Sequence, residues 1–101
     1  MRPIERISAM EAVLRQGREA LDRLSAALED YAALRPGLRA LDAYYGGEDW
    51  RRDLALDEAG QLPADLPRGV LSEDGIYNLL TDERELLGEM RQLLEECARE
   101  D

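Results

Sequence analysis

The sequence predicts an all-α fold. Apolar residues recur at helical spacing near both ends of the chain, no stretch of useful length alternates as a strand does, and 101 residues suit one core. We expect two long antiparallel helices, about 3–34 and 72–99, with a short helix and an irregular capping segment between them. The whole chain, 1–101, is expected to form a single helical domain.

The first long helix is predicted from a heptad pattern. Apolar residues repeat every seven positions in two series offset by three, as in a packed helical face. The series are Ile7, Leu14, Leu21, Leu28 and Met10, Gly17, Leu24, Tyr31. Pro36 is expected to end this helix, because the residue before a proline avoids helical backbone angles.

The middle of the chain is expected to begin with a short helix over 36–45, ended by Gly46 and Gly47. Residues 48–52 are compatible with one further turn. From there to Arg68 the helical pattern breaks down, and two prolines exclude a regular helix or strand interior. This stretch is predicted to be a loop held by apolar anchors.

The last long helix is predicted to start at Ser72, whose hydroxyl is suited to capping free backbone amides. Glu73 and Asp74 would then lie at the positive end of the helix dipole. A broad apolar face follows, which is typical of a helix that meets more than one neighbour. Its residues are Ile76, Leu79, Leu80, Leu86, Leu87, Met90, Leu93, Leu94 and Cys97.

The charge is unevenly distributed. Residues 1–45 contain seven arginines and seven acids, whereas residues 46–101 contain six arginines and sixteen acids, which accounts for the net charge of −10. Such a surface repels nucleic acid and anionic lipid. We therefore expect no direct nucleic-acid binding and no membrane association, and basic partners are favoured.

The single cysteine, Cys97, excludes an intramolecular disulfide. The first residues lack the apolar stretch of a signal peptide, and no apolar run approaches the roughly 20 residues needed to span a bilayer. A cytoplasmic location is therefore expected.

The sequence offers few groups for catalysis. It has no histidine, which is the commonest general base near neutral pH, and its glycines do not form a phosphate-binding loop. An enzyme is therefore less favoured than a binding protein, and we expect no cofactor. The alternative is a metal-binding protein or a magnesium-dependent enzyme that uses carboxylates spaced by four residues. Its candidate ligands are Asp49, Asp53, Asp57 and Glu58.

The aromatic residues are clustered between Tyr31 and Tyr77. They fill the core in one interpretation and form a recognition surface in the other, since Tyr, Trp and Arg are enriched at interface hot spots. The second interpretation predicts a non-enzymatic protein-interaction module using segment 42–77. Its candidate partner-binding residues are Tyr44, Tyr45, Trp50, Asp53, Asp57, Glu58 and Arg68. A third hypothesis is a structural homodimer formed through Leu79, Leu86 and Leu93.

The middle of the chain also carries a recognisable signature. It begins with Leu41-Asp42-Ala43-Tyr44-Tyr45-Gly46 and Trp50, passes through Asp57-Glu58-Ala59-Gly60 and Leu62-Pro63, and ends with the stretch from Arg68 to Leu80. This pattern resembles a family of small bacterial proteins of unknown function, with Gly47 where serine is expected. The resemblance implies a bacterial origin, and it carries over no established activity, cofactor or catalytic residue.

Overall fold

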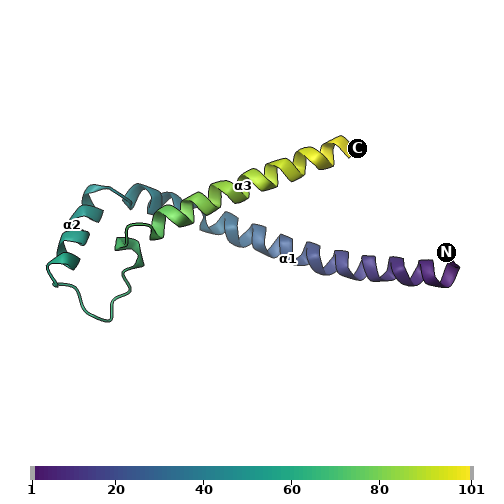
Figure 1. The fold of residues 1–101 in the computed structure, drawn as a ribbon, viewed down its shortest axis with the longest axis horizontal. Helices are drawn as coiled ribbons and strands as arrows, with labels where there is room; N and C mark the ends of the chain where they lie inside the picture. Colours follow the sequence, from purple (N-terminus) through teal and green to yellow (C-terminus); the bar gives the residue numbers. More distant parts are fainter. Residues whose placement is uncertain (1, 101) are drawn as a thin grey trace. The chain divides into compact units, whose positions relative to one another are not determined.

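The structure is a computed structural model that describes residues 2–100 (Figure 1). Those residues form an all-α fold, as predicted, with long helices and a short helix between them. In chain order the elements are α1 (Pro3–Tyr44), α2 (Glu48–Glu58), the 3₁₀ turn η1 (Gly69–Leu71) and α3 (Gly75–Glu100). No helix among the described residues combines the length and apolarity needed to cross a bilayer.

The chain divides into two compact units, Met1–Pro36 and Gly37–Asp101, called here the N-terminal and C-terminal units. Within the N-terminal unit, α1 runs without interruption from Pro3 to Pro36. Six apolar heptad residues of this unit have exposed side chains: Ile7, Met10, Leu14, Leu21, Leu24 and Leu28. The antiparallel pairing of the two long helices and the single domain over 1–101 stay predictions.

The expected helix end at Pro36 is wrong, because α1 continues through Pro36 to Tyr44. The predicted short helix over 36–45 is the last part of α1. An interior proline removes one backbone hydrogen bond and costs about 3 kcal/mol. Burial offsets that cost here, since Leu38 is only 7% exposed and an apolar side chain contributes about 1.5–3 kcal/mol when fully buried.

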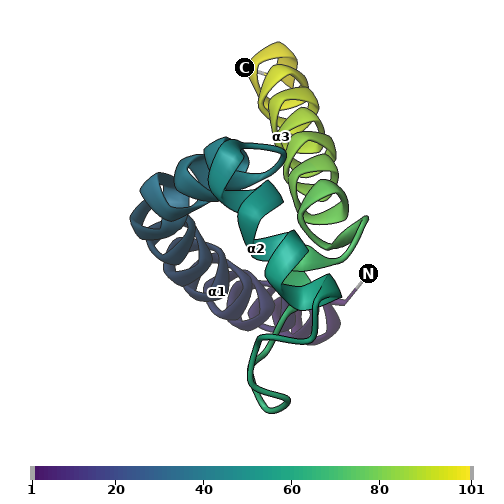
Figure 2. The ribbon, with the colours of Figure 1, turned by 90° about the vertical axis from the view of Figure 1, so that its left-hand side faces the viewer.

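The loop predicted over 53–68 starts later than expected. Helix α2 runs to Glu58, and Gly60 follows with a φ of +69°, a conformation that glycine adopts without steric cost. The remaining loop leaves the end of α2 and returns towards the start of α3 (Figure 2). Prolines in this loop exclude a regular helix, as the sequence predicted.

Helix α3 begins at Gly75, three residues after the predicted start, and ends at Glu100. Ser72 still makes the predicted capping contact, because its hydroxyl oxygen accepts a hydrogen bond of 3.0 Å from the Gly75 amide. The same hydroxyl donates to the carbonyl of Gly69 at 2.7 Å. The cap therefore fastens η1 to the first turn of α3.

The core of the C-terminal unit lies where the end of α1 meets the start of α3. Leu38 and Ile76, which is 2% exposed, are the two buried apolar residues of the described chain. Arg39 on α1 forms an ion pair with Glu83 on α3 beside them. These contacts fix the helix ends around which segment 42–77 folds.

Candidate partner-binding site

Trp50 and Tyr45 tie segment 42–77 together. Their rings meet edge to face with centroids 5.5 Å apart. The Trp50 indole nitrogen donates a 2.9 Å hydrogen bond to the carbonyl of Val70, and the Tyr45 hydroxyl donates a 3.1 Å bond to the carbonyl of Glu73. Two candidate partner-binding residues thus hold the chain around η1 in place.

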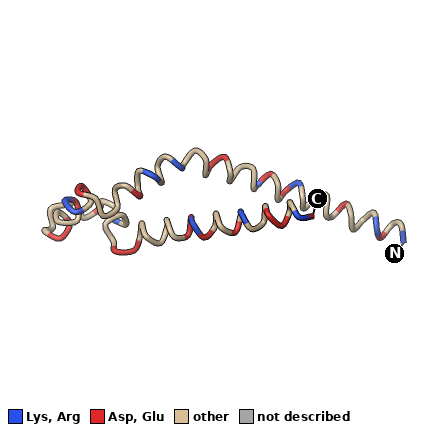
Figure 3. Tube along the Cα trace, turned by 90° about the horizontal axis from the view of Figure 1, so that it is seen from above, with Lys and Arg blue, Asp and Glu red and all other residues tan. Residues whose placement is uncertain are grey.

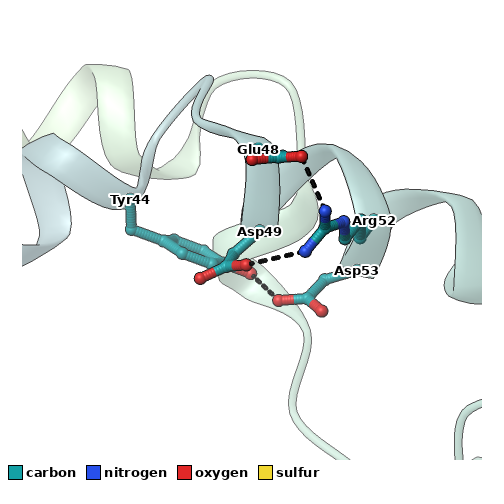
Figure 4. Close-up of polar contacts among 5 residues, drawn as sticks. All are labelled: Tyr44, Glu48, Asp49, Arg52 and Asp53. Carbon is teal, nitrogen blue, oxygen red and sulfur yellow. Dashed lines mark hydrogen bonds and ion pairs between the residues drawn. The ribbon is translucent and has the colours of Figure 1, made fainter.

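Tyr44 lies at the end of α1 and is bound to α2. Its hydroxyl donates a 2.8 Å hydrogen bond to a carboxylate oxygen of Asp53 (Figure 4). Partial burial raises the pKa of Tyr44 above its usual value of 10.0, and the hydrogen bond to Asp53 and the negative charges of Asp53 and Asp49 raise it further. The neutral hydroxyl is therefore the form that the fold stabilises.

Arg68 joins the loop to α2 through an ion pair with Asp57 of 2.6 Å, in which both side chains are about two-thirds covered. Glu58, which follows Asp57 in the sequence, is exposed at the end of α2. Of the seven candidate partner-binding residues, the structure thus places six in contacts within the C-terminal unit. Their role in binding a partner stays a prediction.

The four candidate metal ligands lie on α2, which is one continuous helix from Glu48 to Glu58. From the sequence we expected at most one helical turn here, over residues 48–52. Asp49 pairs with Arg52 at 3.7 Å, in the contact drawn in Figure 4. Asp53 accepts from Tyr44, and Asp57 binds Arg68. Among residues 2–100, no three acidic or sulfur side chains converge as ligands of a metal ion do.

An apolar hollow of about 350 Å³ opens beside this network. It lies where the end of α1, η1 and the first turns of α3 come together. Its lining consists of Leu41, Pro67, Gly69, Val70, Gly75, Ile76 and Leu79. Because the Trp50 indole nitrogen is hydrogen-bonded to the carbonyl of Val70, Trp50 supports one wall of the hollow.

The hollow continues into an apolar stripe along α3, which we call the leucine stripe: Leu79, Leu86 and Leu93. Residues seven apart lie on one face of a helix, so the stripe starts at the hollow and follows α3. Its members are 47%, 58% and 58% exposed, respectively. Such a continuous exposed apolar face is typical of an interaction surface.

Several of these surface residues were missed as site candidates from the sequence. Val70, Pro67 and Gly69 line the hollow but belong to no periodic pattern, since they stand in η1 or in the loop before it. Two signals pointed to them: their position beside the predicted start of the last helix and, for Gly69 and Val70, the signature stretch from Arg68 to Leu80. The leucine stripe was recognised as part of a wide face.

The charge of helix α3 is mostly negative. Helix α3 carries seven acids and three arginines, which Figure 3 shows along the trace. In α1 up to Pro36 the numbers of arginines and acids are nearly equal. Helix α3 therefore carries an excess of negative charge that this part of α1 lacks.

Comparison with known proteins identifies a matching family and nothing more specific. Residues 7–93 match the family described as "Domain of unknown function (DUF4298)". No curated protein and no solved structure matches the chain.

Proposed function

Because the chain belongs to the family described as a domain of unknown function (DUF4298), we propose its role from its own geometry: it is a protein-interaction module. The partner would bind to the hollow and the leucine stripe of the C-terminal unit. The observation that carries this proposal is the exposure of Leu79, Leu86 and Leu93 in line with an apolar hollow.

Free energy favours covering this face. An apolar side chain contributes about 1.5–3 kcal/mol when it is fully removed from water, and the leucine stripe leaves much of that gain unrealised. A partner helix with apolar residues three, four and seven positions apart would cover the stripe and place one side chain in the hollow.

In this proposal, segment 42–77 has a supporting role as well as a binding one. The hydrogen bond from Trp50 to Val70 and that from Tyr45 to Glu73 hold the wall of the hollow. A wall that is fixed before binding lowers the ordering cost of association. The aromatic residues would thus act by shaping the surface that the partner contacts.

The test is quantitative capture of proteins from the cells that produce this chain, using tagged full-length protein. Leu86→Asp places a charge in the proposed interface, and Leu66→Asp places the same charge on another exposed leucine of the same unit. We expect a protein held by wild type and Leu66→Asp to be reduced at least about 10-fold by Leu86→Asp. Equal capture by all three would contradict the proposal.

A further inference from the structure

We infer that the N-terminal unit binds the same unit of a second copy of the chain, so that two α1 helices lie antiparallel along one apolar face. We call this face the heptad face: Ile7, Met10, Leu14, Leu21, Leu24 and Leu28, with Gly17 in the same line. The inference concerns a different unit from the proposed function and does not depend on it.

The heptad face is uncovered within the N-terminal unit. Its six apolar side chains are between 43% and 68% exposed, and the residues from Pro3 to Pro36 form one helix, which cannot bury its own apolar side. A helix in water obtains most of its stability from packing such a face against another element. Two apolar series with a seven-residue period are the pattern by which two helices interlock side by side.

A second copy fits this face in one antiparallel register. In an antiparallel pair, a residue of one series lies opposite a residue of the other series. With the two-fold axis between positions 15 and 16, Leu14 lies opposite Gly17 of the second copy and extends over it. The other layers, each formed twice, are Leu21 with Met10 and Ile7 with Leu24.

Charges beside the heptad face select the same register. Glu11 and Arg18 border one edge, which faces its own copy in an antiparallel pair. In this register Glu11 of each copy lies opposite Arg18 of the other. A shift by seven residues in either direction would oppose two glutamates or two arginines, and like charges that face each other disfavour a register.

Both charges are available for these contacts. Among residues 2–100, Glu11 forms no ion pair, and Arg18 pairs with Asp22 at 3.3 Å in a contact whose side chains are both largely exposed. The guanidinium of Arg18 has five N–H donors, so it can bind a second carboxylate as well.

The other edge of the heptad face carries small apolar residues: Val13, Ala20 and Ala27. In the antiparallel pair this edge also faces its own copy, with Val13 near Ala20. A parallel pair would place Arg6 beside Glu11, which is favourable, but it would also place Val13 beside Arg18. It would put the two Gly17 residues in one layer and leave a gap there. The antiparallel pair therefore fits better on both edges and in the core.

The sequence of helix α3 does not offer the same complement. Its apolar residues form two overlapping seams, and in an antiparallel pair each seam would turn one edge towards Arg18. For the seam through Leu80 and Leu87, the residues of that edge are Tyr77, Arg84, Arg91 and Ala98. For the seam through the leucine stripe, they are Leu80, Leu87 and Leu94. Neither edge contains an acid for Arg18, whereas a second α1 supplies Glu11.

Sedimentation equilibrium of the full chain tests this inference by measuring the dissociation constant of the dimer. Leu14→Asp should raise that constant at least about 10-fold, because it places a carboxylate in an apolar layer. Leu66→Asp, on an exposed leucine of the other unit, should change it by less than about 3-fold. Leu86→Asp should also leave the dimer intact, so this interaction and the proposed function can fail separately.

A charge exchange tests the orientation and the register. Glu11→Arg and Arg18→Glu should each raise the dissociation constant about 10-fold, because each replaces two attractive contacts by two repulsive ones. The variant with both changes restores the attraction and should lie within about 3-fold of wild type. Glu19→Arg and Arg23→Glu are the matched controls, since they change the net charge equally on the outward side of α1. Retained helicity by circular dichroism confirms that the variants fold.

Several results would overturn the inference. A wild-type chain that is still monomeric at about 100 μM would assign the heptad face to another helix, whether of the same chain or of a different protein. A doubly exchanged variant that dimerises no better than the single variants would contradict the antiparallel register. Weakening by Glu11→Arg with no effect of Arg18→Glu would indicate a parallel pair. A dimer that Leu86→Asp dissociates and Leu14→Asp does not would be formed through α3 instead.

Discussion

The Trp50 indole nitrogen donates a 2.9 Å hydrogen bond to the carbonyl oxygen of Val70, a residue that lines the apolar hollow. The bond joins α2 to η1 across 20 residues of chain. It gives the tryptophan a structural role, since the wall of the hollow depends on a contact that only an N–H donor at this position makes.

Removing this donor should destabilise the C-terminal unit. Trp50→Phe retains an aromatic ring near Tyr45 but leaves the Val70 carbonyl without the indole donor, which should cost about 0.5–1.5 kcal/mol. Trp50→Ala should cost more, because the edge contact with Tyr45 is also lost. Urea unfolding followed by circular dichroism measures both. A Trp50→Phe variant as stable as wild type would contradict this role.

The hydrogen bond between Tyr44 and Asp53 should appear in the pH dependence of stability. Since the folded state raises the pKa of Tyr44, its contribution is complete below the unfolded value of 10.0 and is lost as pH rises through the folded value. Tyr44→Phe should therefore be less stable than wild type by about 0.5–1.5 kcal/mol at neutral pH, and the difference should shrink above pH 10.

Unfolding measured from pH 7 to pH 11 checks this prediction. Tyr77→Phe is the matched control, because it removes the hydroxyl of a tyrosine that is 54% exposed. Asp53→Asn should lower the pKa of Tyr44 in an ultraviolet titration, since it removes a negative charge beside the hydroxyl. If the difference in free energy of unfolding between Tyr44→Phe and wild type grows above pH 10, the predicted direction of the pH dependence is wrong.

Two glycines of α3 should respond in opposite directions to alanine. A Cβ at Gly75 would lie 2.5 Å from the Gly69 carbonyl oxygen and 2.7 Å from the Ser72 hydroxyl, so the cap must shift. A Cβ at Gly88 meets nothing within 4 Å. Gly75→Ala should lower the free energy of unfolding by at least about 1 kcal/mol, whereas Gly88→Ala should raise it by about 0.5–1 kcal/mol. Stabilisation by both changes would show that η1 and α3 are not closely joined.

Pro36 should limit the stability of α1. Pro36→Ala restores an amide donor inside the helix and should raise helicity and thermal stability, by up to about 3 kcal/mol. Pro3→Ala is the control, because Pro3 stands at the first helical position, where its amide would have no partner within the helix. Circular dichroism melts of the two variants should therefore differ. Equal effects would mean that α1 is interrupted at Pro36.

The sequence predicted the class of fold well, because apolar residues recur every seven positions in both long helices. The end of the first helix was misplaced because the expectation considered only the effect of Pro36 on the backbone of the residue before it. Burial of Leu38 in the C-terminal unit is a tertiary effect that no local rule includes. Ser72 shows the opposite case, in which the capping residue was recognised and only the first helical residue differed.

The candidate site was predictable only in part. Trp50 and Tyr45 were identified from composition and clustering, but their partners are backbone carbonyls of Val70 and Glu73, which carry no residue-specific signal. The hollow arises from the meeting of three elements and so cannot be read from periodicity. In contrast, the leucine stripe was visible because it follows one helix.

Photocrosslinking in the cells that produce the chain tests the central claim most directly, that the exposed face of α3 binds a different protein. A photoreactive side chain replaces Leu86 within the leucine stripe or Gly88, which has open space around it and lies on the opposite side of α3. We predict a crosslink from position 86 to a second, non-identical polypeptide and at least about 10-fold less from position 88. Equal crosslinking from both positions, crosslinking only to another copy of this chain, or none from position 86 would contradict the account.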